Sequence, residues 1–298
     1  MPHQVGKRQD ILVAMDWTDF ERDDQATLVL SLVTGHGRAA PLLWLTVWKE
    51  ELKNQRNKYE DGCLRRLSEV VPAGCRVTIL ADRGFGDQKL FAFLGELSFD
   101  YVIRFRGNIS VTDADGLTKR AAGWVGKSGR ARKLRDARVT AKGQQVGAVV
   151  CVHAKGMKEP WCLATSLREA TAATLVNHYA RRWTIEPQFR DTKDLQFGMG
   201  LSATRIGEPM RRDRLLLVSA FATALLTLLG MAGESLGMDR MLKSNTSKTR
   251  VHSLFRQGCM LYDLIPNMPE HRLLPLMQKF NEAVMNAAEF GVAFTQAQ

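Results

Sequence analysis

The sequence predicts an α/β fold in which helices cover both faces of a mixed sheet. Up to residue 105, short apolar runs alternate with helical patterns in the order β-β-β-α-β-α-β. Turn residues such as Gly35-His36-Gly37 and Pro72-Ala73-Gly74 separate these segments. Hydrophobic residues make up 45% of the 298 residues and charged residues 24%, a balance that excludes collagen-like, coiled-coil and disordered chains.

The elements of this layer follow one another closely along the chain. The apolar runs that predict strands are 11–16, 27–33, 42–48, 75–81 and 100–105. The glycine turn joins the second and third of these strands into a hairpin, and helical spacing of apolar residues predicts helices over 54–70 and 88–97. Strands and helices in this order are typical of a ribonuclease-H-like layer.

Residues 106–160 differ in composition, because Gly, Ser, Thr and basic residues dominate there. Alternation with a period of two over 132–140 and 145–153 predicts a β-rich insertion in the main fold. Between Lys119 and Lys142 nine basic residues face one acid, which favours a surface that contacts phosphates. The alternative is a solvated hairpin that only keeps the protein soluble.

Helical patterns dominate the rest of the chain. After a strand at 161–165, a helix is expected from about 170 to 195, and amphipathic segments follow around 251–262 and 270–290. Residues 215–232 carry no charge over 18 positions, which is the lower limit for a membrane-spanning helix. We expect a helix buried on all sides in the protein rather than a membrane anchor. The expected division is a catalytic domain over 1–200, interrupted at about 106–160, and a helical region over 201–298.

The net charge and the cysteine content indicate which partners and which compartment to expect. The net charge is +11 and the isoelectric point is near 9.6, which favours an anionic partner, with nucleic acid ahead of a membrane surface. No two of the five cysteines are spaced as CxxC, so we expect reduced thiols rather than a disulfide framework or a zinc site. The first ten residues contain no apolar segment of a secretory signal. A cytoplasmic protein is expected.

A group of polar residues carries the chemistry. On one continuous helix, Tyr179, Arg182, Glu186 and Lys193 fall within an arc of about 60°, with Arg190 beside them. A solvent-exposed ion pair between Arg182 and Glu186 is the plainer explanation of this stripe.

Two acids at strand ends favour a catalytic explanation. Asp16 and Asp82 each follow a predicted strand, where ligands of such sheets bind, and with Glu186 they form a set of three carboxylates. Three carboxylates held close together repel one another unless a cation neutralises them, and hard oxygen ligands select Mg²⁺ or Mn²⁺. Two such ions can support an in-line phosphoryl transfer.

These residues resemble a known enzyme family. The segment YARRWTIEPQFRDTKD matches the Y-x2-R-x3-E-x6-K signature of bacterial insertion-sequence transposases with a DDE triad. The resemblance runs from AMDWTDF through LADRGFGD to SLFRQGCMLYD, over nearly the whole chain. Residues 181–201 also resemble the enzyme of the composite tetracycline-resistance transposon and its relatives.

The resemblance implies a fold, a reaction and roles for individual residues. The fold is ribonuclease-H-like with a β-rich insertion before the helix that bears the Glu. The reaction is Mg²⁺-dependent cut-and-paste transposition: strand nicking, hairpin formation, hairpin opening and strand transfer. Asp16, Asp82 and Glu186 would be the metal ligands. A dimer assembled on DNA is the expected partner state.

Duplex DNA, at the transposon ends and at the target, is the expected substrate. Tyr179, Arg182 and Lys193 would contact it near the cleaved end. Trp161 and Trp183 are candidates for stacking on distorted or flipped bases, although ordinary packing explains either tryptophan equally well. The other residues expected to contact DNA are Arg190, Arg130, Arg132, Lys133 and Arg135.

The chain departs from the family pattern in two places. Only fifteen residues precede Asp16, so we expect it to lack the N-terminal region that recognises transposon ends. Pro187 follows Glu186 directly, so the helix should kink or a second helix should start there, which could move Lys193 out of the arc. The first departure leaves open a truncated, catalytically silent protein that inhibits transposition by binding DNA or transposase subunits. A stand-alone nuclease that cleaves RNA–DNA hybrids is a third hypothesis.

Overall fold

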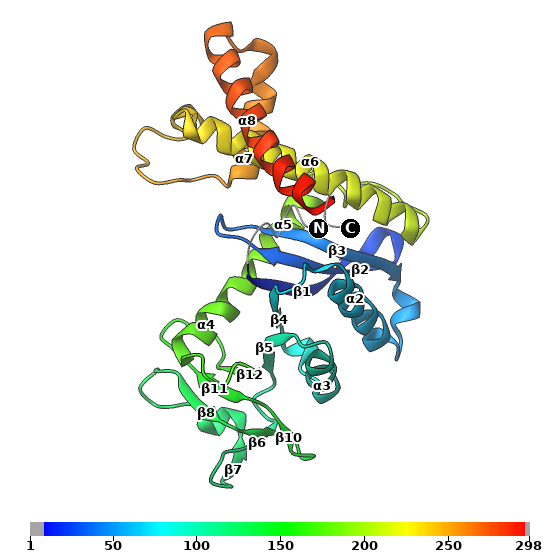
Figure 1. Ribbon diagram of the computed structural model, residues 1–298, viewed down its shortest axis with the longest axis vertical. Helices are drawn as coiled ribbons and strands as arrows, with labels where there is room; N and C mark the ends of the chain where they lie inside the picture. The colour runs from blue at the N-terminus through cyan, green and yellow to red at the C-terminus, as the bar shows by residue number, and fades with distance from the viewer. Residues whose placement is uncertain (1–8, 296–298) are drawn as a thin grey trace.

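The computed structural model describes residues 9–295, with side chains up to residue 286, and an eight-stranded mixed sheet forms its centre (Figure 1). The first five strands in spatial order are β3 (Ala39–Trp48), β2 (Gln25–Val33), β1 (Asp10–Phe20), β4 (Arg76–Ala81) and β5 (Asp100–Phe105). β1, β2 and β3 pair antiparallel, and β4 and β5 run parallel to β1. This arrangement is that of a ribonuclease-H-like sheet, which confirms the predicted fold class.

The predicted strands are present, and β1, β2 and β3 are longer than expected, β1 most of all. β1 continues four residues past Asp16 to Phe20, because Trp17–Phe20 pair with the start of β2 across the 3-10 turn Glu21–Asp23. Its polar residues obscured this extension in the sequence. Every residue of β2 is buried, since the strand lies between β1 and β3 and is covered on both faces.

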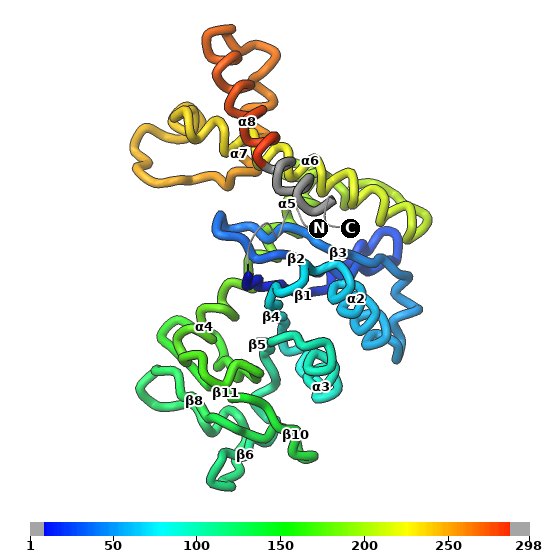
Figure 2. Tube along the Cα trace, viewed as in Figure 1, coloured from blue at the N-terminus to red at the C-terminus, as the bar shows by residue number. Residues whose placement is uncertain are grey.

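Two pairs of helices cover the two faces of the sheet (Figure 2). α2 (Arg56–Val70) and α3 (Gln88–Glu96) pack on one face, where residues such as Leu64 and Leu94 join the larger core cluster. α4 (Ala172–Arg181) and α5 (Ile185–Lys193) pack on the other face, with Leu175, Tyr179 and Ile185 against alternate residues of the same strands. Because side chains alternate along a strand, the residues on the α4 side of β1 are the even-numbered ones.

Part of the predicted insertion belongs to the main sheet. Beyond β5 the sheet continues with β12 (Trp161–Thr165), β11 (Ala148–Val152) and β8 (Arg132–Arg135). A second sheet has the order β10-β9-β6-β7, and its strands are β10 (Gln144–Gln145), β9 (Arg138–Val139), β6 (Ser110–Thr112) and β7 (Thr118–Arg120). Trp124 is buried under this smaller sheet and donates a hydrogen bond to the Val111 carbonyl.

Three long helices, α6 (Pro209–Ser235), α7 (Leu254–Leu264) and α8 (Glu270–Thr295), lie beyond the β3 edge of the sheet (Figure 1). α6 is attached at its start. The fully buried Arg212 donates to Asp23 and, at 2.6 Å, to Gln25, and its guanidinium lies over the Phe20 ring. The α6 N-terminal turn also binds the edge strand, because Asp213 accepts a hydrogen bond from the Thr46 amide.

The prediction that the uncharged stretch is buried on all sides is wrong. Within the described residues α6 is the one helix long and apolar enough to cross a membrane, and only 22% of its apolar window is buried. The helix touches β3, α7 and α8, and the part that they leave uncovered carries exposed apolar residues, Leu217, Val218, Phe221 and Leu225. A helix at the edge of a sheet has too few neighbours to be covered all round.

Glycines let α6 and α7 cross closely. A Cβ added to Gly230 would collide with the Leu254 carbonyl, and one added to Gly258 would collide with the Leu226 carbonyl. Both obstacles are backbone atoms, which cannot rotate away as a side chain could. The absence of a side chain at these two positions therefore sets the distance between the helices.

Gly258→Ala should therefore reduce the free energy of unfolding by about 1–3 kcal/mol, the usual cost of overpacking. Gly62→Ala in α2 is the matched control, because a Cβ there meets no atom within 4 Å. The control should be neutral or stabilise by about 0.5–1 kcal/mol through helix propensity. Denaturant unfolding of both variants checks this, and equal stabilities would contradict the proposed close crossing.

Candidate active site

Two carboxylates emerge side by side from the parallel pair β1 and β4. The register pairs Met15 with Ala81, so Asp16 and Asp82 are the next residues on each strand. Alternation places both on the α4 side of the sheet, with Ala14 and Leu80 of that core cluster. Asp16 Oδ1 accepts the Trp17 amide at 2.9 Å, and Asp82 Oδ1 accepts the Gly84 amide at 2.7 Å.

The third acid, Glu186, lies in the first turn of α5. The expected continuous helix over 170–195 is broken, because α4 ends at Arg181 and a 3-10 turn, Arg182–Thr184, separates it from α5. Pro187 therefore occupies an N-terminal helical position, where its missing N–H removes no internal hydrogen bond. The second helix begins two residues before Pro187.

Arg182 links two of the acids. Its Nη1 lies 3.1 Å from Asp16 Oδ2 and its Nη2 lies 3.6 Å from Glu186 Oε1. The Arg182 side chain is only 5% exposed, whereas that of Glu186 is 46% exposed. The guanidinium also lies over the rings of Tyr179 and Trp183.

Burial raises the pKa of Asp16 to about 6; the nearby Arg182 opposes this shift and the neighbouring Asp82 adds to it. Burial also raises the pKa of Tyr179, against the effect of Arg182 and Arg104. The charge of Asp16 is therefore only partly compensated by the side chains around it.

The donor set fits a hard divalent cation in its chemistry. Three carboxylates supply oxygen ligands of the kind that Mg²⁺ and Mn²⁺ prefer. Among the residues that the structure describes, however, no group of three or more His, Cys, Asp or Glu side chains is placed to hold an ion. A guanidinium, rather than open space, lies between Asp16 and Glu186.

The break in the helix separates the residues of the predicted arc. Lys193 points away from the acids, because its Nζ donates to the Asp19 carbonyl and lies over the Phe20 ring. Arg190 is exposed on α5. The single 60° stripe is therefore wrong, since it assumed one unbroken helix across Arg182–Thr184.

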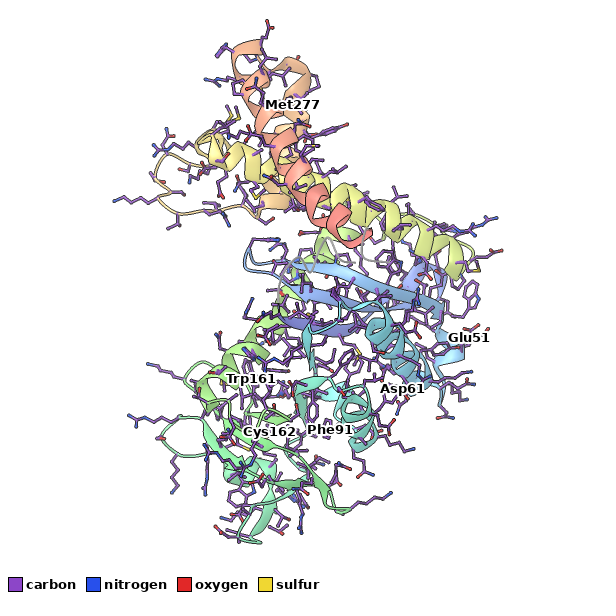
Figure 3. The ribbon with its side chains drawn as sticks, viewed as in Figure 1. Glu51, Asp61, Phe91, Trp161, Cys162 and Met277 are labelled. Carbon is purple, nitrogen blue, oxygen red and sulfur yellow. The ribbon has the colours of Figure 1, made fainter. Side chains whose placement is uncertain are left out.

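The aromatic candidates differ in exposure. Trp161 lies at the start of β12 (Figure 3). Tyr179 is buried, and Trp161 packs edge-on against it with ring centroids 4.9 Å apart and an interplanar angle of 76°. Trp183 is 45% exposed at the helix break and is free to meet a ligand from solvent. Ordinary packing thus accounts for Tyr179 and Trp161, and not for Trp183.

The basic candidates of the insertion also fall into two groups. Arg130 and Arg135 are exposed, and Arg132, also exposed, lies over the Trp124 ring. The Lys133 ammonium instead donates to the carbonyls of Arg168 and Ala170 and fastens β8 to the segment before α4.

A family model described as a transposase DDE domain matches residues 8–222 of the 298-residue chain. The chain belongs to this family of transposases. Transposases of this family act on DNA, and the family generally uses divalent metal ions.

A comparison with curated proteins finds no match. Among solved structures, the chain is similar to an Argonaute of Marinitoga piezophila in complex with a 5′-OH guide RNA. The identity is 10% and the TM-score 0.25, and the match covers 58% of this chain and 26% of that one, about a quarter of its length. The fold assignment rests on the strand order and the family match.

The structure adds residues to this transposase site that sequence reasoning missed. Arg104 on β5 faces the α4 side, and its Nη2 donates to Glu159 at 2.8 Å. Glu159 also accepts from Arg83, in the turn after Asp82, at 3.0 Å. The sequence contained one signal for Arg104: it is a charged residue inside the otherwise apolar run 100–105. A buried strand rarely carries an arginine unless the residue has a specific role.

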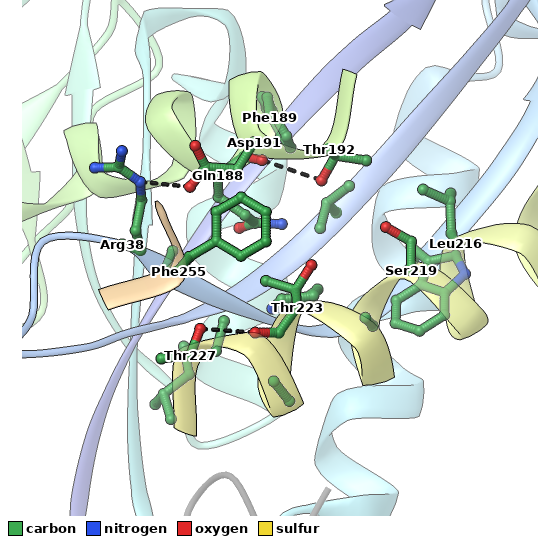
Figure 4. Close-up of a pocket in the computed structure, with 18 of the residues that line it drawn as sticks. Arg38, Gln188, Phe189, Asp191, Thr192, Leu216, Ser219, Thr223, Thr227 and Phe255 are labelled. Atoms are coloured by element: carbon green, nitrogen blue, oxygen red, sulfur yellow. Dashed lines mark hydrogen bonds and ion pairs between the residues drawn. The ribbon is translucent and has the colours of Figure 1, made fainter. Parts of the chain in front are cut away.

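A cavity of about 510 Å³ in the transposase lies between β2, β3, α5 and α6 (Figure 4). Its walls are mostly apolar, and Gln188, Asp191 and Lys193 reach it from α5. None of the three acids lines it. The cavity reflects the loose packing of α6 on the sheet rather than the candidate active site.

Asp16→Asn should raise the free energy of unfolding at pH 7 by about 1–3 kcal/mol, because one pKa unit corresponds to about 1.4 kcal/mol. Since the pKa of Asp16 is raised to about 6 in the folded chain, the folded state binds this proton more tightly than the unfolded state. The destabilisation of the native chain by the charged Asp16 is therefore complete above pH 6. It decreases as the pH falls towards about 4 and Asp16 becomes protonated.

Denaturant unfolding at several pH values measures this difference, which should shrink in acid. Asp115→Asn is the control at an exposed position and should change stability by less than about 0.5 kcal/mol. If Asp16→Asn is less stable than the native chain at pH 7, the unfavourable burial of Asp16 is disproved.

Proposed function

We propose that this transposase cuts and joins DNA strands by phosphoryl transfer, with Asp16, Asp82 and Glu186 as its metal-binding carboxylates. The supporting observation is the position of Asp16 and Asp82, side by side where the parallel strands β1 and β4 part, with Glu186 bound to the same guanidinium as Asp16. The edge of a sheet at the carboxyl ends of parallel strands is where ligands of such folds bind.

The chain's own residues would orient the substrate and the acids. A divalent cation such as Mg²⁺ or Mn²⁺, when bound, would activate an attacking oxygen and stabilise the leaving one. The Gly84 amide fixes the rotamer of Asp82, and the Trp17 amide fixes one oxygen of Asp16. Arg182 offers a planar pair of donors that matches a phosphate.

The DNA would lie across the exposed cations around this site. Trp183 and Arg190 border the helix break, and Arg130, Arg132 and Arg135 extend the positive surface over β8 and the preceding loop. We infer duplex DNA, both transposon ends and target, as the substrate, and nicking, hairpin formation, hairpin opening and strand transfer as the reaction sequence. A homodimer on DNA in the bacterial cytoplasm is the expected working state.

Asp16→Asn, Asp82→Asn and Glu186→Gln should each reduce Mg²⁺-dependent nicking of duplex DNA by more than about 100-fold. The reason is that metal-assisted stabilisation contributes several kcal/mol and about 1.4 kcal/mol corresponds to a factor of ten. DNA binding in a gel-shift assay should remain close to native. Glu169→Gln, which removes an exposed acid outside the site, should nick at the native rate.

The same assay separates the other hypotheses. A native chain that binds DNA, never nicks it and blocks a full-length relative would be the silent inhibitor. Cleavage of RNA–DNA hybrids without strand joining would indicate a stand-alone nuclease. Native nicking by any of the three variants would remove that residue from the catalytic set.

Arg130→Ala and Arg135→Ala should each make the negative slope of log affinity against log salt concentration less steep by about 0.9, the value for one lost phosphate contact. Lys133→Met is the comparison, because that ammonium already binds two carbonyls and should change the slope less. Titrations of a fluorescent duplex at several salt concentrations measure these slopes. An unchanged slope in both arginine variants would contradict a DNA-binding role for this surface.

A further inference from the structure

Arg182 occupies an unusual position for a DNA-contacting residue. Its guanidinium is buried and lies within ion-pair distance of Asp16 on β1 and of Glu186 on α5. Asp16 and Glu186 are 170 positions apart in the chain, so this one side chain connects the strand with the helix. Two acids proposed as ligands of a dication are thus joined by a monocation.

The hydrogen bonding of Arg182 is incomplete. Its Nε is buried and has no hydrogen-bond partner. A buried donor without a partner is unfavourable, so the guanidinium retains capacity for a further acceptor. A phosphate oxygen is the kind of acceptor that an arginine fork fits.

The backbone next to Arg182 is not held in a regular helix. Arg182 begins the 3-10 turn between α4 and α5, and the next residue, Trp183, is exposed. Short 3-10 segments of this kind often mark hinges. The guanidinium can therefore change partners without unfolding either helix.

We propose that Arg182 takes the place of a divalent cation between Asp16 and Glu186 in the DNA-free chain, and that a DNA phosphate draws the guanidinium away and frees both carboxylates. The inference rests on the proposed function, because it assumes that these acids bind metal. It adds that DNA and metal bind cooperatively and that the chain alone binds metal weakly.

In this arrangement Arg182 competes with the metal ion for the carboxylates, and DNA binding is therefore linked to metal binding. A guanidinium and a metal ion need the same carboxylate oxygens, so the bound arginine lowers the apparent metal affinity. If DNA removes the competitor, DNA raises metal affinity, and metal must raise DNA affinity by the same factor. A transposase built this way would hold its metal mainly when its substrate is in place.

The first experiment uses the native chain. Binding of Mn²⁺ is measured by electron paramagnetic resonance, with and without a saturating short DNA duplex. The Mn²⁺ bound by the duplex alone is measured separately and subtracted. We expect the duplex to tighten Mn²⁺ binding by about tenfold, within the usual range of coupling between two sites. A change of less than about twofold would overturn the proposal.

The second experiment removes the guanidinium. Arg182→Met should bind Mn²⁺ about tenfold more tightly than the native chain without DNA, and the duplex should no longer add to it. Arg66→Met, which removes an exposed cation of α2 on the opposite face of the sheet, is the matched control and should behave like the native chain. Equal Mn²⁺ affinity in Arg182→Met and the native chain would overturn the proposal.

Arg182→Lys covers the case in which the methionine variant does not fold. A single ammonium cannot span both acids, so this variant should bind Mn²⁺ more tightly than the native chain by a smaller factor. Native affinity in Arg182→Lys would then count against the proposal.

Failure of the proposed function gives a different result. Adding Asp16→Asn to Arg182→Met should abolish the gained Mn²⁺ binding. If the gain persists, the ion binds elsewhere, and the assignment of Asp16 as a ligand is wrong whether or not DNA and metal are coupled.

Discussion

The parallel pairing of β1 with β4 is the constraint on which the site depends. It fixes Asp16 and Asp82 as neighbours, although 66 positions separate them in the chain, and it directs both toward the helices α4 and α5. β2 pairs antiparallel with the other edge of β1, and the helices α2 and α3 cover the opposite face of the sheet and bury its apolar residues. Two like charges are thereby held together at the edge of a dry core, where only a cation can offset them.

Much of the layer could be predicted because its local signals agree with its tertiary packing. The strands at 100–105 and 161–165 match β5 and β12, and the glycine turn forms the β2–β3 hairpin as expected. Asp16 and Asp82 stand out in the sequence as candidate site residues, because an acid directly after an apolar run is costly unless it has a function. The signature around Glu186 added the third acid, whose role stays a prediction.

The remaining features depend on contacts that a single sequence does not record. The turn at Arg182–Thr184 separates α4 from α5, so helical angles counted across this turn misplaced Lys193. β11 pairs with the free edge of β12, and β8 pairs with β11, so both strands extend the main sheet. No local sequence pattern specifies which segments pair in this way. α6 is exposed because few elements pack against it, whereas its apolar composition alone predicted a helix buried on all sides.

The buried contact of Arg212 with Asp23, Gln25 and Phe20 bears on where the chain can be divided. These three partners belong to β1, β2 and the turn between them, so the first helix of the C-terminal region completes the packing of the strand that carries Asp16. A fragment that stopped near residue 200 would open this end of β1 to water and leave Asp23 without its counter-charge. The sheet and the C-terminal helical region therefore form one cooperative unit where Arg212 contacts the sheet. A minimal fragment for crystallography or assays has to retain the start of α6.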